Sequence, residues 1–554
     1  MTRLREALAR RILVLDGAMG TMIQAAGLGP ADFGGPQYDG CNEHLNLTRP
    51  EVVRDIHHAY LDAGADIVST NTFGCAPYVL AEYGLGDRAY DIALAAARIA
   101  RAAAGDRFVA GAMGPSTRSI SVTRNVTFDE VREAYYVQAK ALVAGGVDAL
   151  LLETVQDTLN LKAAAIGVRR ALGEAGADVP LMISATIEPM GSMLAGQGVE
   201  ALYVSVQHLA PFSIGLNCAT GPEFMTDHVR SLAGLATCFV TVYPNAGLPD
   251  ERGQYGETPK SLAFKLRRFV DEGWVNVVGG CCGTTPAHIA ELAGLVRGRT
   301  PRVPAPAEPQ AVSGVEALAP AADNRPLFVG ERTNVIGSRK FKDLVVGDRF
   351  ADAAEVGRAQ VKAGAQVLDV CLANPDRDET ADMDRFMREL TRRVKVPLMI
   401  DSTDARVIEL ALRHCQGKAI VNSINLEDGE ERFEKVIPLV HRYGAAVVVG
   451  CIDEDKARGM AVTRQRKLAI AERSHRLLTE KYGLAEEDII FDALVFPVGT
   501  GDQNYVGAGA ETVEGVRLIK EALPRTKTIL GVSNVSFGLP AAGREVLNSV
   551  FLYH

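Results

Sequence analysis

The stretch TFDEVREAYYVQAKALVAGGVDALLLE (residues 127–153) contains the unit from which the fold follows. Its first part, Thr127–Gly145, has apolar residues at helical spacing, which predicts an amphipathic helix. Its last part, 149–153, is an apolar run without polar alternation, which is typical of a parallel strand buried on both faces. A helix followed directly by such a strand indicates a β/α repeat.

The same rhythm runs through the first half of the chain. Further amphipathic segments include Pro50–Ala63 and Thr258–Glu272. Strands are expected at 12–16, 66–71, 108–112, 149–153, 181–186, 213–217, 239–243 and 275–279. Eight strands that are each followed by a helix predict a closed (β/α)8 barrel, and an open doubly wound sheet is the alternative.

A proline- and alanine-rich segment, residues 300–326, indicates an extended linker. It divides the chain into domains expected at 1–299 and 327–554. Strands of the second domain are expected at 327–331, 366–370, 397–401, 418–422, 446–450, 489–493 and 528–533, with a helix beginning near Ala541. The expected fold class is therefore α/β, with two (β/α)8 TIM barrels in tandem, the second truncated before its eighth strand. The alternative is a true C-terminus and an open or seven-stranded barrel.

The composition argues against nucleic-acid-binding, membrane-spanning and secreted disulfide-rich proteins. The chain has 554 residues, of which 47% are hydrophobic and 23% charged, and its net charge of −9 gives no indication of nucleic acid as a partner. No apolar run approaches the roughly 18 residues of a membrane span, and the run 12–15 is too short for a signal peptide. Nine thinly spread cysteines argue against a secreted disulfide framework, so a cytoplasmic location is expected.

Three cysteines follow the ends of predicted strands. Cys218 lies in GLNCATG (215–221), and Cys281 and Cys282 lie in GGCCGT (279–284). Because the flanking glycines relax the backbone, both neighbouring thiols can turn towards one point above the barrel. Three thiolates suit zinc and leave a fourth position open, as in catalytic zinc sites. The alternatives are three core cysteines or a disulfide between neighbours.

A substrate thiol that entered this open position would lose its proton and become a nucleophilic thiolate. Asn245, after strand 239–243, could fill the position without substrate, or could be a turn residue. Glu153, after the fourth strand, could bind an α-ammonium group or tether a loop. Ordinary packing is expected for Cys41, Cys75, Cys238, Cys371, Cys415 and Cys451.

Residues 10–298 resemble the zinc-dependent homocysteine S-methyltransferases. The motifs that carry the resemblance, in strand order, are LDGAMGT (15–21), TNTF (70–73), LLET (151–154), NC (217–218) and GGCCG (279–283). The resemblance implies that the three cysteines hold zinc. It also implies that homocysteine is bound by Asp16, Gly17, Ala18, Met19, Asn71, Thr72 and Glu153.

Polar residues end the strands of the second half. They lie in GERTN (330–334), at Asp369, in DST (401–403), in NSIN (422–425), at Asp492 and in SNVSFG (533–538). Acids and amides that face one barrel mouth suit a ligand with alternating donors and acceptors, such as a pterin. The alternative is that several of them satisfy loop backbone groups.

These motifs resemble the pterin-binding barrels, which include dihydropteroate synthases and methyltetrahydrofolate:corrinoid methyltransferases. The resemblance implies that the pterin is held by Asp401, Asn422 and Asp492, with Glu331, Asn334 and Asn534 near the reacting end. The Asn534 amide would hydrogen-bond the ring nitrogen and favour the protonated form that can leave.

The two barrels in this order resemble the N-terminal half of cobalamin-dependent methionine synthases. The resemblance implies methyl transfer from 5-methyltetrahydrofolate through a cobalamin carrier to homocysteine. Cobalamin would bind to a domain outside this chain or to another protein, because no Asp-x-His-x-x-Gly signature is present; the nearest string, at 55–60, has Tyr60 in place of glycine. The alternatives are another methyl donor, such as a betaine or sulfonium compound, and a zinc- and folate-binding module without turnover.

Overall fold

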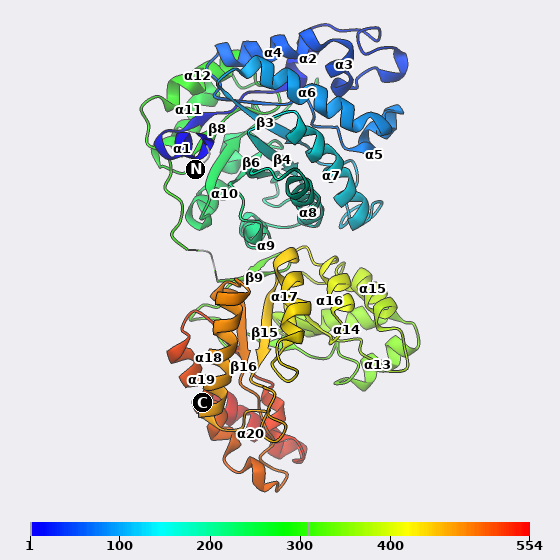
Figure 1. Ribbon diagram of the computed structural model, residues 1–554, viewed down its shortest axis with the longest axis vertical. Helices are drawn as coiled ribbons and strands as arrows, with labels where there is room; N and C mark the ends of the chain where they lie inside the picture. Colours follow the sequence, from blue (N-terminus) through cyan, green and yellow to red (C-terminus); the bar gives the residue numbers. More distant parts are fainter. Residues whose placement is uncertain (1–2, 308–309) are drawn as a thin grey trace. The chain divides into compact units, whose positions relative to one another are not determined.

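The computed structural model describes residues 3–307 and 310–554, which belong to two compact units, Met1–Pro309 and Gln310–His554 (Figure 1). In each unit, parallel strands alternate with helices. Within the described part of the chain, no helix combines the length and the apolar character needed to span a bilayer.

The first unit contains the predicted closed barrel. Its strands are β1 (Leu13–Val14), β2 (Ile67–Ser69), β3 (Phe108–Met113), β4 (Ala149–Val155), β5 (Leu181–Ala185), β6 (Ser213–Asn217), β7 (Phe239–Tyr243) and β8 (Val277–Val278). They pair in parallel from β1 through β8 and back to β2. A parallel bridge between Leu15 and Ile67 joins β1 to β2 and closes the barrel, so the prediction of eight strands is confirmed.

The helices of this unit cover the barrel from outside (Figure 1). They are α1 (Arg3–Arg10), α2 (Met19–Ala25), α3 (Leu45–Thr48), α4 (Pro50–Asp62), α5 (Pro77–Leu80), α6 (Ala89–Ala104), α7 (Phe128–Ala144), α8 (Thr158–Ala175), α9 (Val199–Val206), α10 (Pro222–Leu235), α11 (Pro259–Asp271) and α12 (Pro286–Val296). Helix α7 begins where the sequence indicates, because Thr127 and Glu130 form a capping box.

Helix α1 closes the amino end of the first barrel. Its Leu4 and Leu8 are buried in the same cluster as inward-facing strand residues such as Phe108 and Phe212. The Arg5 guanidinium lies 5.0 Å from the Phe212 ring centroid, a cation–π distance. This end of the barrel is therefore sealed mainly by apolar contacts.

The second unit contains seven parallel strands in chain order. They are β11 (Val329–Gly330), β12 (Val367–Val370), β13 (Leu398–Asp401), β14 (Ile420–Ile424), β15 (Ala446–Gly450), β16 (Ile489–Asp492) and β17 (Lys527–Ile529). The predicted number of strands is confirmed, and β11 and β17 each pair with one strand in the described residues. The seventh strand is shorter than predicted, because residues Val532–Ser536 form a 3₁₀ helix, η9.

The helices of the second unit alternate with these strands. They are α13 (Arg339–Val346), α14 (Phe350–Lys362), α15 (Glu379–Leu390), α16 (Ala405–Leu412), α17 (Glu431–Tyr443), α18 (Arg464–Arg476), α19 (Ala508–Ala522) and α20 (Ala541–Tyr553). Helix α20 begins at Ala541, as expected.

The proline-rich segment 300–326 contains ordered structure that its composition did not indicate. Arg302 is buried in the first unit, where it donates to the carbonyls of Ala233 and Cys238. Strands β9 (Val312–Ser313) and β10 (Ala317–Leu318) form a hairpin on the second unit. Only residues 308–309 of the predicted linker lie outside the described residues.

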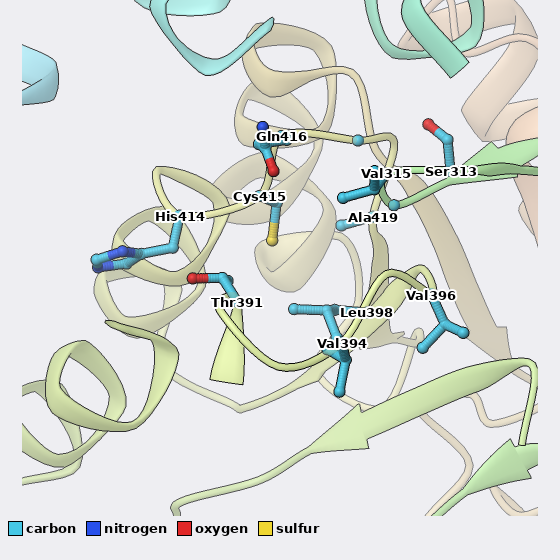
Figure 2. Close-up of a pocket in the computed structure, with 12 residues that line it drawn as sticks. Ser313, Val315, Thr391, Val394, Val396, Leu398, His414, Cys415, Gln416 and Ala419 are labelled. Atoms are coloured by element: carbon cyan, nitrogen blue, oxygen red, sulfur yellow. The ribbon is translucent and has the colours of Figure 1, made fainter. Parts of the chain in front are cut away.

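This hairpin packs at the amino end of the second barrel. The Lys418 N–H donates to Ser313 Oγ at 2.9 Å, and the Ser313 N–H donates to the Lys418 carbonyl at 3.1 Å. A pocket of about 30 Å³ lies beside it, and Figure 2 shows side chains of Val396, Cys415 and Ala419 around it. Because Val396 and Ala419 precede β13 and β14, this pocket lies opposite the strand ends that carry the predicted folate residues.

Candidate functional site

The structure brings together the three cysteines singled out by the sequence. The sulfur atoms of Cys218, Cys281 and Cys282 all lie within 4.8 Å of one another, and those of Cys218 and Cys282 are 4.0 Å apart. All three are half-buried free thiols, so they form neither a disulfide nor a closed core cluster. Three converging sulfur donors at an accessible mouth fit a zinc ion.

Backbone conformation aims these thiols at one point. Cys218 has φ +62° and Gly283 has φ +80°, both in the left-handed region. A non-glycine residue in that region is strained, and such strain is typical of functional sites. The loops after β7 and β8 are also joined, since the Cys281 N–H donates to the Pro244 carbonyl at 2.8 Å and the Ala246 N–H to the Cys282 carbonyl at 2.9 Å.

Asn245 lies between these two hydrogen bonds. Its side chain is almost fully buried, and its amide oxygen Oδ1 has no hydrogen-bond partner. A buried amide oxygen without a partner carries a desolvation cost that a bound cation would relieve. Its position and its chemistry therefore fit a fourth ligand beside the three sulfurs.

The pKa values of the three thiols are shifted in different directions. The Cys218 and Cys281 thiols hydrogen-bond to Cys282 and lower its pKa to about 3, whereas the same contacts raise the pKa of Cys281 well above its ordinary value. Cys282 is thus the thiol that loses its proton most readily, and the thiolate is the form that binds a metal.

Two acidic side chains of the predicted homocysteine set lie in the same mouth. Burial raises the pKa of Asp16 to about 7, although Ser69 donates two hydrogen bonds of 2.7 Å to its carboxylate. Burial, together with the charges of Asp16 and Cys282, raises the pKa of Glu153 to about 8. Tyr243, which sequence reasoning missed, donates to Glu153 at 3.1 Å. An ammonium group would stabilise the ionised forms of both acids.

Residues 17–19 form the turn between β1 and α2. The Ala18 N–H donates to Thr284 Oγ1 at 3.2 Å, and the Tyr60 hydroxyl donates to the Ala18 carbonyl at 3.0 Å. A Cβ atom on Gly17 would lie 2.8 Å from the Tyr60 ring, so glycine is required there. Met19 is the first residue of α2. The turn is therefore held beside the loop that carries Cys281.

Asn71 and Thr72 are placed differently from the acids. The Asn71 amide donates to the Asn42 carbonyl and to Asn46, and the Thr72 hydroxyl donates to the Ala112 carbonyl at 2.6 Å. Both side chains are buried, and they hydrogen-bond to the 42–46 segment and to β3, which fixes the loop after β2 in place.

Sequence reasoning also missed the side chains that connect the strand ends. Asn217 hydrogen-bonds both the backbone and the hydroxyl of Thr154, accepts from Ser184 and approaches the Cys281 sulfur at 3.9 Å. The neighbouring Cys218 in the NC motif was the only signal for it. These contacts join β4, β5 and β6 beneath the thiols.

The second barrel presents a polar layer above an apolar one. Val367, Met399, Ile420 and Ile490 belong to one buried cluster. Two residues further along the same strands are Asp369, Asp401, Asn422 and Asp492. Because side chains alternate along a strand, these polar groups face the same interior.

Asn334 links two acids of this layer. Its amide nitrogen donates to Asp369 at 3.0 Å and to Asp401 at 3.4 Å, while its amide oxygen accepts from the N–H groups of Ile336 and Gly337. Burial raises the pKa of Asp401 to about 6 and that of Asp369 to about 7. Asp369 belongs to the polar set that the sequence places at this mouth, but no contact with the pterin was assigned to it.

The other predicted folate residues lie in this layer or beside it. Burial raises the pKa of Asp492, whose carboxylate accepts from the Leu494 N–H at 2.9 Å. Glu331 is exposed, and its charge raises the pKa of Asp401. The Asn422 amide lies close enough to lower the pKa of Asp369. Asn534 is exposed on η9, so it lies at the rim.

Comparison with known proteins gives a different family match for each of the two barrels. Residues 13–296 match the homocysteine S-methyltransferase family, and residues 330–554 match the pterin-binding enzymes. Methionine synthase of Mycobacterium tuberculosis is 42% identical over 566 residues, which cover 100% of this chain and 47% of that protein. The chain thus spans about half the length of this curated relative.

Two solved structures are also similar. The metallated homocysteine methyltransferase MmuM of Escherichia coli is 24% identical, with a TM-score of 0.43 over 52% of this chain and 99% of that one. Dihydropteroate synthase of Xanthomonas albilineans is 16% identical, with a TM-score of 0.28 over 42% and 85%. The family match over 13–296, which covers half of the chain and includes all three clustered cysteines, shows that this chain belongs to the homocysteine S-methyltransferase family.

Proposed function

We propose that this chain is the homocysteine- and folate-binding part of a cobalamin-dependent methionine synthase. It would take part in methyl transfer from 5-methyltetrahydrofolate through a cobalamin carrier to homocysteine, giving methionine and tetrahydrofolate. The observation that carries the proposal is the pairing of a three-thiol cluster in one unit with an acid–amide layer in the other. A methyltransferase that used a betaine or sulfonium donor would have no use for the second layer.

The sulfur cluster would hold zinc through Cys218, Cys281 and Cys282, with Asn245 as the fourth donor until substrate enters. When bound, the metal lowers the pKa of a thiol ligand, so homocysteine sulfur would be presented as a thiolate at neutral pH. Asn217, which approaches the Cys281 sulfur, would keep the cluster aligned.

The amino-acid end of homocysteine would be held by Glu153 and Asp16. Asp16 is buried and Glu153 is half-buried, and each is positioned by a hydrogen bond from a neighbouring side chain. Because their pKa values are raised, both acids ionise less readily in the empty site. A cation bound beside them would favour the ionised carboxylates. The α-ammonium group supplies that cation, and the 17–19 turn would enclose the rest of the molecule.

The pterin of 5-methyltetrahydrofolate would lie against the polar layer of the second barrel. Asp401, Asn422 and Asp492 offer acceptors and donors for its ring edge. Asn334 would act mainly through the two acids it links, because its amide groups are already hydrogen-bonded. Glu331 and the rim residue Asn534 would lie near the reacting nitrogen, where the amide of Asn534 would favour its protonated form.

Exposed apolar side chains support a large carrier. In the first unit, those that follow strand ends are Phe73, Val122, Met190, Leu194, Phe224 and Leu248. In the second unit they are Ile336, Met460, Val498, Val506 and Phe537. A partner that docked over each mouth would remove these side chains from water. A cobalamin-binding domain would be such a partner.

The test is demethylation of added methylcobalamin by homocysteine, followed by visible absorbance, in the zinc-loaded chain. Methionine should form, and Cys282→Ala should abolish the reaction. Cys238→Ala, which removes a half-buried cysteine of the same barrel outside the cluster, should leave it intact. If the folded, zinc-loaded chain does not react, another methyl donor or a binding role without turnover becomes the better reading.

A further inference from the structure

A buried lysine lies beneath the mouth of the second barrel. Lys467 of α18 is completely buried, and its ammonium group donates to the carbonyls of Ala461, Ala493 and Leu494. The Cδ atom of this side chain lies 2.7 Å from where a Cβ atom on Gly515 would be, so α19 leaves room for the lysine stem. Burying an ammonium group costs desolvation free energy, so a buried lysine is usually found where other groups hydrogen-bond to it.

Two of the carbonyls that Lys467 binds, those of Ala493 and Leu494, belong to the turn that follows Asp492. Leu494 has φ +60°, an unfavourable conformation for a leucine. Its N–H donates to Asp492 Oδ1 at 2.9 Å, and its carbonyl accepts from both Lys467 and Thr512. Lys467 therefore reaches Asp492 through one strained residue.

We propose that Lys467 is a positioning residue of the folate site, which fixes the Asp492 carboxylate in the barrel mouth and keeps it ionised for the pterin. The proposal rests on the folate role of the second barrel proposed above. A pterin N–H is bound more tightly by a carboxylate than by a neutral acid, because the hydrogen bond is then charge-assisted.

The charges around Asp492 favour this role. Lys467 of α18 lowers the pKa of Asp492, while Glu331 after β11 and burial raise it. Lys467 is faced by Asp492, by Cys451 after β15 and by Glu511 of α19. Burial raises the pKa of Cys451 to about 12, so that thiol is neutral, and Glu511 is engaged by Arg464 at 2.6 Å. Burial lowers the pKa of Lys467 to about 8, so its ammonium group is charged below that pH and there offsets the effect of the Glu331 charge on Asp492.

The experiment measures the affinity of the whole chain for 5-methyltetrahydrofolate by calorimetry from about pH 5 to about pH 8. Lys467→Met should weaken folate binding about tenfold to a hundredfold near neutral pH. It should also raise the pH below which affinity falls, because Asp492 would be protonated at a higher pH. Thr512→Val is the matched control, because it removes a neutral hydrogen bond to the same Leu494 carbonyl. It should leave the pH midpoint in place.

A double-mutant cycle separates positioning from general support. In an Asp492→Asn background, Lys467→Met should change affinity by less than about twofold, because its effect acts through the missing carboxylate. The inference would be overturned if the two substitutions reduced affinity independently, so that their fold-losses multiplied in the double variant. It would also be overturned if Lys467→Met left the pH midpoint of folate affinity unchanged. Neither result would contradict the folate role of the barrel. If the wild-type chain does not bind the folate, the proposed function of this barrel and the inference both fail. If Lys467→Met does not fold, Lys467→Gln is used with the same criteria.

Discussion

The two barrels carry their chemistry at different points of the same architecture. In the first, the thiols lie beyond the strands, in loops where Cys218 and Gly283 adopt left-handed backbone. In the second, Asp401 and Asp492 are the last residues of β13 and β16. Loop residues can converge on one small ion, whereas strand-end residues spread around the mouth and suit a flat ligand. The position of the functional groups thus matches the size of what each barrel would bind.

The opposite ends differ as well. Helix α1 seals the first barrel with two buried leucines, while the β9–β10 hairpin adds Val312 to the apolar cluster of the second and hydrogen-bonds to Lys418 through Ser313. Apolar burial is worth more per residue than a single hydrogen bond. We therefore expect the two seals to contribute unequally to stability.

Removing the metal should produce the largest difference between the activities of the two barrels. Treatment with a strong chelator should reduce homocysteine-dependent demethylation of methylcobalamin by about a thousandfold or more, because the substrate thiol would remain protonated. Folate binding by the second barrel should not change. Zinc added back should restore the reaction, and full activity of demonstrably metal-free protein would contradict the role of the thiol cluster.

Substitution in the apolar seal should produce the largest loss of stability. Leu8→Ala should lower the free energy of unfolding of the first unit by about 2–5 kcal/mol, since Leu8 is fully buried. Fluorescence of Trp274, the single tryptophan, reports this unit alone. Ser313→Ala, in the hairpin seal, should leave the Trp274 transition unchanged. A shift of that transition in Ser313→Ala would show that the units unfold together.

The polar layer of the second barrel can be tested with a single carboxyl group. Asp401→Asn should weaken 5-methyltetrahydrofolate binding about tenfold to a hundredfold, because a charge-assisted acceptor is lost. Asp404→Asn makes the same chemical change at the N-cap of α16, outside the layer, and should have little effect. Demethylation of methylcobalamin at the first barrel should be normal in both variants, as measured by visible absorbance.

The comparison also explains what the sequence could predict. Parallel strands buried on both faces produce continuous apolar runs, so fourteen of the fifteen expected strands, all but the seventh of the second half, lie close to their predicted positions. The alternation of side chains then places Asp401 and Asp492 in the mouth without further information. The thiol cluster was predictable because two adjacent cysteines flanked by glycines are hard to explain otherwise.

Other parts depend on contacts between distant residues, which a local pattern does not contain. Tyr243 meets Glu153 across 90 positions of sequence, and Lys467 reaches carbonyls on another element. Asn71 and Thr72 belong to a motif, and their side chains hydrogen-bond to backbone carbonyls of Asn42 and Ala112 that only the fold brings near. The β9–β10 hairpin is short and lies among prolines, so composition indicated a linker instead.

The smallest effect we predict concerns the pH dependence of stability. The pKa of Glu153 is about 8 in the folded chain because of burial, well above that of an exposed glutamate. The folded state therefore binds more protons than the unfolded state, and stability falls as pH rises from about 4 to about 8. Glu153→Gln removes this term, so it should stabilise the first unit by about 1–2 kcal/mol near pH 8, allowing for partial exposure, and by little near pH 4.

Trp274 fluorescence during urea unfolding at both pH values measures this difference. Glu272→Gln, which makes the same change at an exposed position of the first unit, should show no such pH dependence. The stabilised Glu153→Gln variant should bind homocysteine poorly, because the ionised carboxylate that destabilises the empty site is the group that we propose holds the ammonium. A variant that gained stability and still bound homocysteine normally would assign that contact to Asp16, the other buried acid of the mouth.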